Sequence, residues 1–380
     1  MDTIASQVRD LYNKADEEGR RTLQHELSEL QRSLDTEWDM VIRLASGTLQ
    51  MALAKIGSHL QLFELLAASE IPLSLSHFVE KTKASPELLG HLMRTQAAFG
   101  LFKETGKDEF TANRMTKALA DPDVAGAIAH ATDVHSAVAH VLPDFLKARR
   151  YQNMTSNKDT PFQMAMKTDL TPFEWMKDRP EQMKSLGHAM RIQRAGNWTD
   201  SYPVEREVGA FSPAPNSALL VDVGGGFGQQ SIAFKSRFPS LPGRIVVQDI
   251  PATLDQAKTS EGIEFMVQDF FQPQALKAAK FYYLRHVLHD WMNDDCIKIL
   301  KAIVPAMGPE SRVIIDEVVL PDTNVPWQAA YMDITMMASL GGMERTKAEW
   351  EILMDQAGLK ILEIHKYDPK MQSIIVAAPQ

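Results

Sequence analysis

The sequence predicts an α/β protein with a doubly wound, mostly parallel sheet in its C-terminal part and a mainly helical N-terminal part. From about residue 217 onward, short apolar runs alternate with segments of helical period, which is typical of such a sheet. Before that point, apolar residues recur mostly at helical spacing. With 380 residues, the chain is long enough for two domains.

The composition excludes several classes of protein. The net charge of −9 argues against a basic surface for nucleic acid. Cys296 is the only cysteine, so no intramolecular disulfide can form, and we expect a reducing, cytoplasmic compartment. The first residues mix acids and bases and do not resemble a signal peptide. The sequence lacks an apolar run of about 18 residues, so we expect no transmembrane helix and no membrane partner.

We expect an N-terminal domain over residues 1–120. Residues 1–36 have one apolar helix face, which covers either its own domain or a partner subunit. Residues 37–120 predict short helices and then a hairpin that turns at 106–108, which is the winged-helix pattern. A non-catalytic, DNA-binding regulator is the alternative for this pattern. The second helix carries Glu87, His91 and Arg94 where such a regulator needs a row of bases, and this disfavours it.

Residues 121–212 read as a helical connection that contributes to a substrate pocket. Methionine and aromatic side chains are frequent here, and they suit either a core or an adaptable apolar cavity for a flat phenolic or polyketide molecule. The predicted substrate-binding residues of this segment are Phe173, Trp175, Met176, Met190 and Trp198. Residues 209–217, with two prolines, predict a linker to a third region over 213–380.

The third region alternates strands and helices. Its predicted strands are 218–224, 244–250, 263–271, 280–288, 311–320, 359–367 and 372–380. Its predicted helices are 231–238, 252–259, 294–307 and 347–358. The last two strands have only a short turn between them, so we expect a hairpin and an antiparallel final strand.

A glycine turn follows the first of these strands. LLVDVGGGFGQQ (219–230) has the spacing D-x-G-x-G-x-G, and the third glycine of the nicotinamide-binding pattern is replaced by Gln229. Asp222 just before the turn would repel a pyrophosphate and attract a cationic ligand. S-adenosylmethionine is cationic and has no phosphate, so the turn favours S-adenosylmethionine over NAD.

Acids at the next two strand ends support a nucleoside ligand. Asp249 follows the second strand, where an acid can bind both ribose hydroxyls, although this position alone also fits NAD. Asp269 and Phe270 follow the third strand and could contact an adenine amino group and its ring face. Three acids at successive strand ends indicate one ligand site.

These motifs resemble the class I S-adenosylmethionine-dependent O-methyltransferases of the caffeic acid and flavonoid type, and their fungal relatives in secondary metabolism. The resemblance covers nearly the whole chain and rests on six ordered motifs: VDVGGGFG, VVQDIP, QDFF, YYLRHVLHDW, DEVVLPD and GGMERT. It implies a Rossmann-like methyltransferase domain, a winged-helix dimerisation domain, a homodimer whose N-terminal domains contribute to the partner's pocket, and catalysis without a metal.

The resemblance also implies roles for particular residues. The cofactor residues are Asp222, Gly224, Gly225, Gly226, Asp249, Asp269, Phe270 and Arg285, the last of which is Lys in many plant members. The catalytic base is His289, supported by Glu317 and Glu344, and further substrate-binding candidates are Asp290 and Met336. Asp290 could equally cap a helix, and His286 reads as a structural histidine.

Residue chemistry agrees with methyl transfer. Histidine has the ordinary pKa that suits deprotonation of a phenol or enol, and an acid such as Glu344 or Glu317 could fix its tautomer. The alternative enzyme is a pericyclase on the same scaffold, which keeps the cofactor and steers a cyclisation or cycloaddition. Loss of the histidine would favour that alternative, and His289 is present. No metal-binding pattern accompanies these residues, so we expect no metal.

Overall fold

The computed structural model describes residues 2–192, 197–209, 211, 217–255, 257–368 and 370–380. The chain forms two compact units, one of Met1–Ser136 with Pro180–Gln193 and one of Ala137–Arg179 with Arg194–Gln380. The segment expected as a separate connection, 121–212, therefore supplies helices to both units. Most of the expected linker, residues 210 and 212–216, lies outside the described residues.

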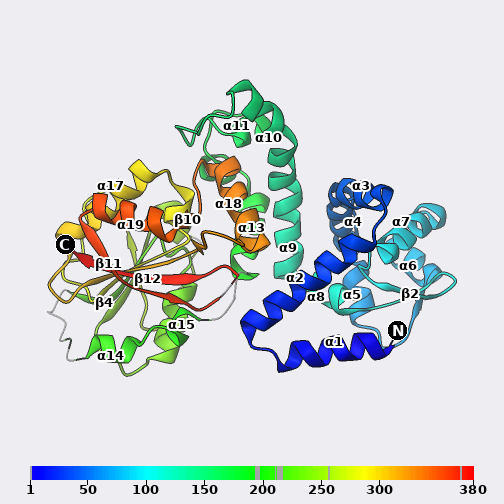
Figure 1. Cartoon of the computed structure of the whole chain (residues 1–380), viewed down its shortest axis with the longest axis horizontal. Coiled ribbons are helices and arrows are strands. Elements are labelled where there is room, and N and C mark those ends of the chain that lie inside the picture. The colour runs from blue at the N-terminus through cyan, green and yellow to red at the C-terminus, as the bar shows by residue number, and fades with distance from the viewer. Residues whose placement is uncertain (1, 193–196, 210, 212–216, 256, 369) are drawn as a thin grey trace. The chain divides into compact units, whose positions relative to one another are not determined.

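The first unit is helical apart from one small sheet (Figure 1). Its helices are α1 (Asp2–Lys14), α2 (Glu17–Leu34), α3 (Glu37–Ala45), α4 (Gly47–His59), α5 (Leu62–Ala67), α6 (Leu75–Thr82), α7 (Pro86–Ala98), α8 (Arg114–Leu119), α9 (Pro122–His130), the π-helix η1 (Ala131–His135) and α13 (Pro180–Ile192). Its antiparallel strands β1 (Leu73–Ser74), β2 (Lys103–Gly106) and β3 (Glu109–Thr111) have the order β1-β3-β2. The predicted winged-helix pattern is confirmed, including the hairpin that turns between β2 and β3.

Aromatic packing holds this unit together. Phe63, Phe78, Phe102 and Phe110 are almost fully buried, and their rings contact one another edge-on or tilted. Edge-to-face contacts between aromatic rings add to the energy of burial. The apolar residues of the segment 37–120 therefore form a compact core that includes the hairpin.

The second unit contains the large sheet (Figure 1). Its strands are β4 (Ala218–Val223), β5 (Arg244–Asp249), β6 (Glu264–Val267), β7 (Phe281–Arg285), β8 (Arg312–Glu317), β11 (Leu359–Lys366) and β12 (Ser373–Pro379), and β9 (Val319–Leu320) pairs with β10 (Arg345–Thr346) in a separate small sheet. The helices are α10 (Ser136–Ala148), α11 (Pro161–Met166), α12 (Pro172–Lys177), α14 (Val204–Val208), α15 (Gln229–Arg237), α16 (Pro251–Leu254), α17 (Asn293–Ile303), α18 (Trp327–Leu340) and α19 (Lys347–Gln356), and the 3₁₀ turns are η2 (Trp198–Asp200), η3 (Leu288–Asp290) and η4 (Val304–Ala306).

The strand order is β11-β12-β8-β7-β4-β5-β6. All pairings are parallel except those of β12, which is antiparallel to both β8 and β11. This is the predicted doubly wound sheet with an antiparallel last strand. The predicted strand at 311–320 divides into β8 and β9, and the predicted helix at 252–259 is reduced to α16.

Helices cover both faces of the large sheet. On one face, Tyr282, Val313 and Ile315 pack with α17 and α19, and on the other, Tyr283 and Ile314 pack with α14 and α15. Because both faces are covered, the central strands are apolar almost throughout, as in parallel sheets generally. No helix within the described residues has the length and apolar character needed to cross a membrane.

Candidate active site

The glycine turn lies at the carboxyl end of β4. Gly224, Gly226 and Gly228 have positive φ angles of 69°, 59° and 79°, which side chains other than glycine rarely adopt. A Cβ added to Gly225 would lie 2.5 Å from Cγ of Asp222, while one added to Gly226 would meet no atom within 4 Å. The turn is therefore packed tightly against its own strand on one side and is open at Gly226, where a ligand could approach the backbone.

The three predicted acids lie at the carboxyl ends of neighbouring parallel strands. Asp249 accepts hydrogen bonds from the backbone N–H groups of Gly226 at 2.9 Å and Ile250 at 2.8 Å, so it connects β5 to the glycine turn. Asp269 is exposed beyond β6 and accepts from the backbone of Phe271. The structure brings these acids to one edge of the sheet, the usual ligand-binding edge of this fold.

Asp222 differs from the other two acids because it is buried. It accepts a hydrogen bond of 2.7 Å from the Ser231 hydroxyl of α15. Burial raises the pKa of Asp222 to about 7, since desolvation disfavours the charged form. A cationic group held at this edge of the sheet would favour the ionised form, and this fits a ligand that carries an ammonium and a sulfonium.

Phe270 is part of an aromatic cluster beside the glycine turn. Its ring lies edge-on to Trp291 with centroids 5.9 Å apart, and a Cβ on Gly224 would be 3.6 Å from it. Trp291 also contacts Phe271 at 4.9 Å. Phe270 was a predicted site residue and Trp291 was not, although Trp291 is the last residue of the YYLRHVLHDW motif.

Arg285, the last residue of β7, is mostly buried. Its guanidinium lies 3.6 Å from Oδ2 of Asp316. The Asp316 carboxylate also accepts hydrogen bonds from the Tyr283 hydroxyl, through Oδ2, and from the Tyr367 hydroxyl, through Oδ1. These contacts keep the pKa of Arg285 above its ordinary value despite burial. The structure therefore places Arg285 in a buried polar network at the ends of β7 and β8. Asp316 belongs to this network and was not predicted from the sequence.

The chain turns sharply after β7 to present His289. His286 has a positive φ of 50°, which ends the strand, and η3 follows. His289 is only 6% exposed, and its Nδ1 lies 2.8 Å from Oε1 of Glu344 and 3.6 Å from Oε2 of Glu317. Its Nε2 lies 3.4 Å from Oδ1 of Asp290. The structure thus brings together three of the predicted site residues that are far apart in the sequence, with Asp290 beside them.

Glu317 and Glu344 have different tasks. Oε1 of Glu317 accepts the backbone N–H groups of Val287 at 2.9 Å and Leu288 at 3.0 Å, so this carboxylate holds the turn before His289. Glu344 pairs directly with the imidazole. This pairing fixes which ring nitrogen carries the proton, because Nδ1 must donate to the carboxylate when the ring is neutral.

The carboxylates change the charge of the imidazole. Burial alone would lower the pKa of His289, but Glu317, Glu344 and Asp290 outweigh it and raise the pKa to about 10. For the carboxyl groups burial acts in the opposite direction, because it disfavours their charged form. It raises the pKa of Glu317 to about 7 and that of Asp290 to about 6. His289 is therefore a strong base whose protonated form is stabilised by its surroundings.

The same three side chains could be considered as metal ligands. Donor atoms of His289, Glu317 and Glu344 lie within 4.8 Å of one another. The 2.8 Å between Nδ1 and Glu344 is a hydrogen-bond distance, shorter than the roughly 3.3 Å that separates two ligands of a tetrahedral zinc ion. We therefore interpret the cluster as a histidine–carboxylate pair.

The predicted substrate-binding residues are dispersed. Phe173, Trp175 and Met176 lie on α12, where Met176 is buried and Trp175 lies edge-on to Phe162. Met336 lies on α18 and is partly buried, whereas Met190 lies on α13 of the first unit and is 52% exposed.

Trp198 has to be reassigned. It is fully buried and stacks on Phe234 and Tyr283, with ring centroids 5.7 and 5.0 Å apart. These rings belong to the core between the sheet and its α14–α15 face. Trp198 is therefore a packing residue, and the prediction of substrate contact is not retained.

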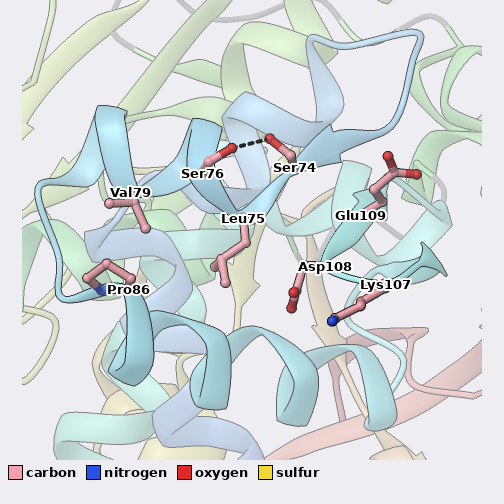
Figure 2. Close-up of a pocket in the computed structure, with 8 residues that line it drawn as sticks. All are labelled: Ser74, Leu75, Ser76, Val79, Pro86, Lys107, Asp108 and Glu109. Atoms are coloured by element: carbon pink, nitrogen blue, oxygen red, sulfur yellow. Dashed lines mark hydrogen bonds between the residues drawn. The ribbon is translucent and has the colours of Figure 1, made fainter.

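A hollow of about 430 Å³ lies in the winged-helix unit (Figure 2). Figure 2 shows it between the start of α6, with the Ser74 and Ser76 hydroxyls 2.8 Å apart, and the turn that carries Lys107 and Asp108. The hollow is open to solvent, and none of the predicted site residues lines it. It does not alter the assignment of the site.

The fold and the edge of acids, glycines and histidine define a class I S-adenosylmethionine-dependent methyltransferase. Residues 158–360 match the O-methyltransferase domain family, and residues 42–121 match the O-methyltransferase dimerisation domain. The chain belongs to this O-methyltransferase family. It is an enzyme whose cofactor is S-adenosylmethionine. Its dimerisation domain supports a homodimer, and its methyltransferase family supports a small-molecule substrate.

Similar proteins agree with this assignment. A demethylsterigmatocystin 6-O-methyltransferase from Aspergillus flavus is 53% identical over 377 residues, covering 99% of this chain and 97% of that protein. The O-methyltransferase okaF from Penicillium ochrochloron is 46% identical and covers 100% of both chains. The structure of LepI in complex with SAM is 35% identical, has a TM-score of 0.94 and covers 100% of this chain and 98% of that chain.

Proposed function

We propose that the enzyme methylates a phenolic hydroxyl of a polycyclic aromatic polyketide, with His289 as the catalytic base. The observation that carries the mechanism is the buried imidazole held 2.8 Å from Glu344. The substrate class is supported by the 53% identity to the Aspergillus flavus enzyme, whose substrate is named as demethylsterigmatocystin.

Asp222, Gly224, Gly225, Gly226, Asp249, Asp269 and Phe270 are the residues we assign to the cofactor. When bound, S-adenosylmethionine supplies an electrophilic methyl group. The acids suit its cationic and ribose groups, and the open face of Gly226 allows close approach to the backbone. Phe270 supplies an apolar ring beside the turn. Arg285 acts more indirectly, because it is paired with Asp316.

His289 prepares the acceptor oxygen. Its Nδ1 donates to Glu344, which leaves Nε2 to accept the proton of the acceptor hydroxyl. The protonated imidazole is then stabilised by Glu344, Glu317 and Asp290. Only the neutral imidazole can accept this proton, so kcat/KM is expected to increase with pH toward the pKa of about 10.

The alternative function is pericyclic catalysis. It is favoured by one observation: a structure described as a pericyclic reaction enzyme has a TM-score of 0.93 and 35% identity to this chain. Such a reaction would convert a substrate into an isomer without transfer of the methyl group. The buried base with its oriented Nε2 favours O-methylation.

The test follows a label. The purified enzyme is incubated with phenolic polyketides, including demethylsterigmatocystin, and with S-adenosylmethionine that carries a deuterated methyl group. Mass spectrometry should detect the labelled methyl on the product, and His289→Ala should slow the transfer by about 10²–10⁴-fold. His365→Ala is the matched control, because His365 is also paired with a glutamate, Glu363, at 2.6 Å but lies on β11.

The possible outcomes separate the hypotheses. Labelled product that depends on His289 and not on His365 supports the proposal. Unlabelled isomers formed only with both protein and cofactor would replace it with the pericyclase. Labelled product that is formed equally by His289→Ala would retain methyl transfer and refute the assignment of the base.

The mode of dimerisation and the cellular location of the enzyme are further parts of the proposal. None of the residues of α2 and α3, all of which the structure describes, is buried. Leu34, Trp38 and Leu44 are 77%, 70% and 87% exposed. Apolar exposure of this extent needs a covering surface, and a second copy supplies it through the adjoining dimerisation domain. We expect each N-terminal domain to reach its partner's pocket. We also expect the enzyme to be cytoplasmic, and a fluorescent fusion would test this location.

A further inference from the structure

Arg345 is a fully buried arginine next to Glu344. It is 0% exposed, and all five of its N–H groups have acceptors. The acceptors are Asn293 Oδ1 at 2.9 Å, Leu288 O at 3.1 Å, Met343 O at 3.3 Å, Trp291 O at 2.9 Å and Cys296 Sγ at 3.4 Å. These acceptors are all neutral groups, and the carboxylate of Asp333 interacts with the guanidinium only electrostatically.

The acceptors belong to two segments that are far apart in the chain. Leu288 and Trp291 flank His289 and Asp290, and Asn293 begins the following helix, α17. The other segment is 343–345, which contains Glu344. One guanidinium therefore joins both ends of the turn that carries the base to the segment that carries its carboxylate.

The two segments also touch through their backbones. The N–H of Met343 donates to the carbonyl oxygen of His289 at 3.1 Å. A Cβ on Gly342 would lie only 1.9 Å from that same oxygen. The contact is close enough that a shift of either segment changes the distance between His289 and Glu344.

Stability alone does not explain this arrangement. Burying a guanidinium removes its hydration, and apolar side chains at such a place are often as stable or more stable. A lysine has three donors on one nitrogen and could not reach acceptors spread around a planar fork. The planar shape and the five donors of arginine suit the task of holding two segments at a fixed separation.

We propose that Arg345 is a positioning residue that sets the hydrogen bond between His289 and Glu344 by joining the 288–293 turn to the 343–345 segment. The inference rests on the proposed role of His289 as the base. Arg345 acts through these residues and does not itself contact the reacting atoms.

The experiment compares Arg345→Lys with Asn293→Ala. Lysine keeps the charge and loses most of the hydrogen bonds, while Asn293→Ala removes one acceptor from an exposed residue and leaves the arginine intact. Arg244→Lys is the control, because Arg244 also makes a two-pronged contact, to Glu264, but lies on β5 and is partly exposed.

Two measurements are made on the full-length enzyme. The first is label transfer, where we expect kcat of Arg345→Lys to fall by up to about 100-fold, with KM little changed, because misplacement by about 1 Å costs on the order of 100-fold in an aligned reaction. Asn293→Ala should lose less, and Arg244→Lys nothing. The second is the pKa of His289 from NMR of isotope-labelled histidines, which should fall in Arg345→Lys as Glu344 moves away from Nδ1.

The NMR measurement does not depend on activity. An unchanged pKa of His289 in Arg345→Lys would overturn the inference, whether or not the enzyme transfers methyl groups. A lowered pKa together with an unchanged kcat would refute His289 as the base while retaining the positioning role. If Arg345→Lys does not fold, Asn293→Ala decides: an unchanged pKa and kcat in that variant would overturn the inference.

Discussion

Gly342→Ala should disrupt catalysis through one backbone contact. Gly342 has no left-handed φ, so alanine is tolerated by its conformation. The added Cβ would nevertheless lie 1.9 Å from the carbonyl oxygen of His289 and 2.8 Å from the carbonyl carbon of Asp290. Both are backbone atoms, which cannot rotate away as a flexible side chain can.

The magnitude follows from the geometry. To reach an ordinary contact of 3.4 Å, the segment after α18 must retreat by roughly 1.5 Å from the turn that carries His289. The hydrogen bond from Met343 to His289 would break, and Glu344 would move with its segment. Misplacement of about 1 Å costs on the order of 100-fold in rate, so we expect kcat to fall by at least that factor. Overpacking should also destabilise the fold by about 1–3 kcal/mol.

The assay is the initial rate of labelled methyl transfer, with cofactor binding by calorimetry and the thermal midpoint measured in parallel. Gly47→Ala is the control, because a Cβ there meets no atom within 4 Å. It should retain the wild-type rate. A Gly342→Ala enzyme that is folded, binds cofactor and turns over at the wild-type rate would refute the reasoning that this close approach sets the site.

Four further predictions follow from the same structure. Glu344→Gln should lower the pKa of His289 by about 1–3 units, so the rising limb of kcat/KM moves to lower pH; a limb that stays in place would contradict the pairing. The pKa of Asp222 in the folded, ligand-free protein is raised to about 7 from 3.8. Its contribution to stability is therefore complete below pH 3.8 and lost as pH rises through 7, and urea titrations should show wild type losing stability relative to Asp222→Asn across that window. EDTA should leave the rate of methyl transfer unchanged, whereas an inhibition reversed by one divalent ion would establish a metal in the histidine–carboxylate cluster. The double substitution Leu34→Glu, Trp38→Glu should lower the mass measured by light scattering from dimer toward monomer, and a dimer of unchanged mass would place the interface elsewhere.

Much of the site was readable from the sequence because its residues stand next to recognisable strand ends. Asp249 and Asp269 follow apolar runs directly, and carboxyl ends of parallel strands share one edge. The glycine spacing after Asp222 also identified the turn, because it directly follows an apolar strand. Such information is local, and a short window of sequence contains it.

Local patterns were insufficient where several environments share one composition. Trp198 and Met176 lie in segments of similar aromatic and methionine content, yet Trp198 is in the core against the sheet. Periodicity reports that a side chain faces inward and does not report whether a core or a cavity receives it. The burial of Arg345 is likewise not visible in the sequence, because its hydrogen-bond acceptors lie mostly in a distant segment.

The sequence by itself determined the fold class, the order of the elements, the antiparallel final strand and the edge of the sheet where the cofactor residues gather. These follow from hydrophobic period, turn residues and the handedness of strand–helix–strand connections. Only the tertiary structure decided that His289 pairs with Glu344 through Nδ1, that Glu317 holds the backbone of the turn, and that Arg345 joins the two segments. The physical reason is that these contacts join residues about 30 to 57 positions apart, and their distances depend on how the intervening helices pack.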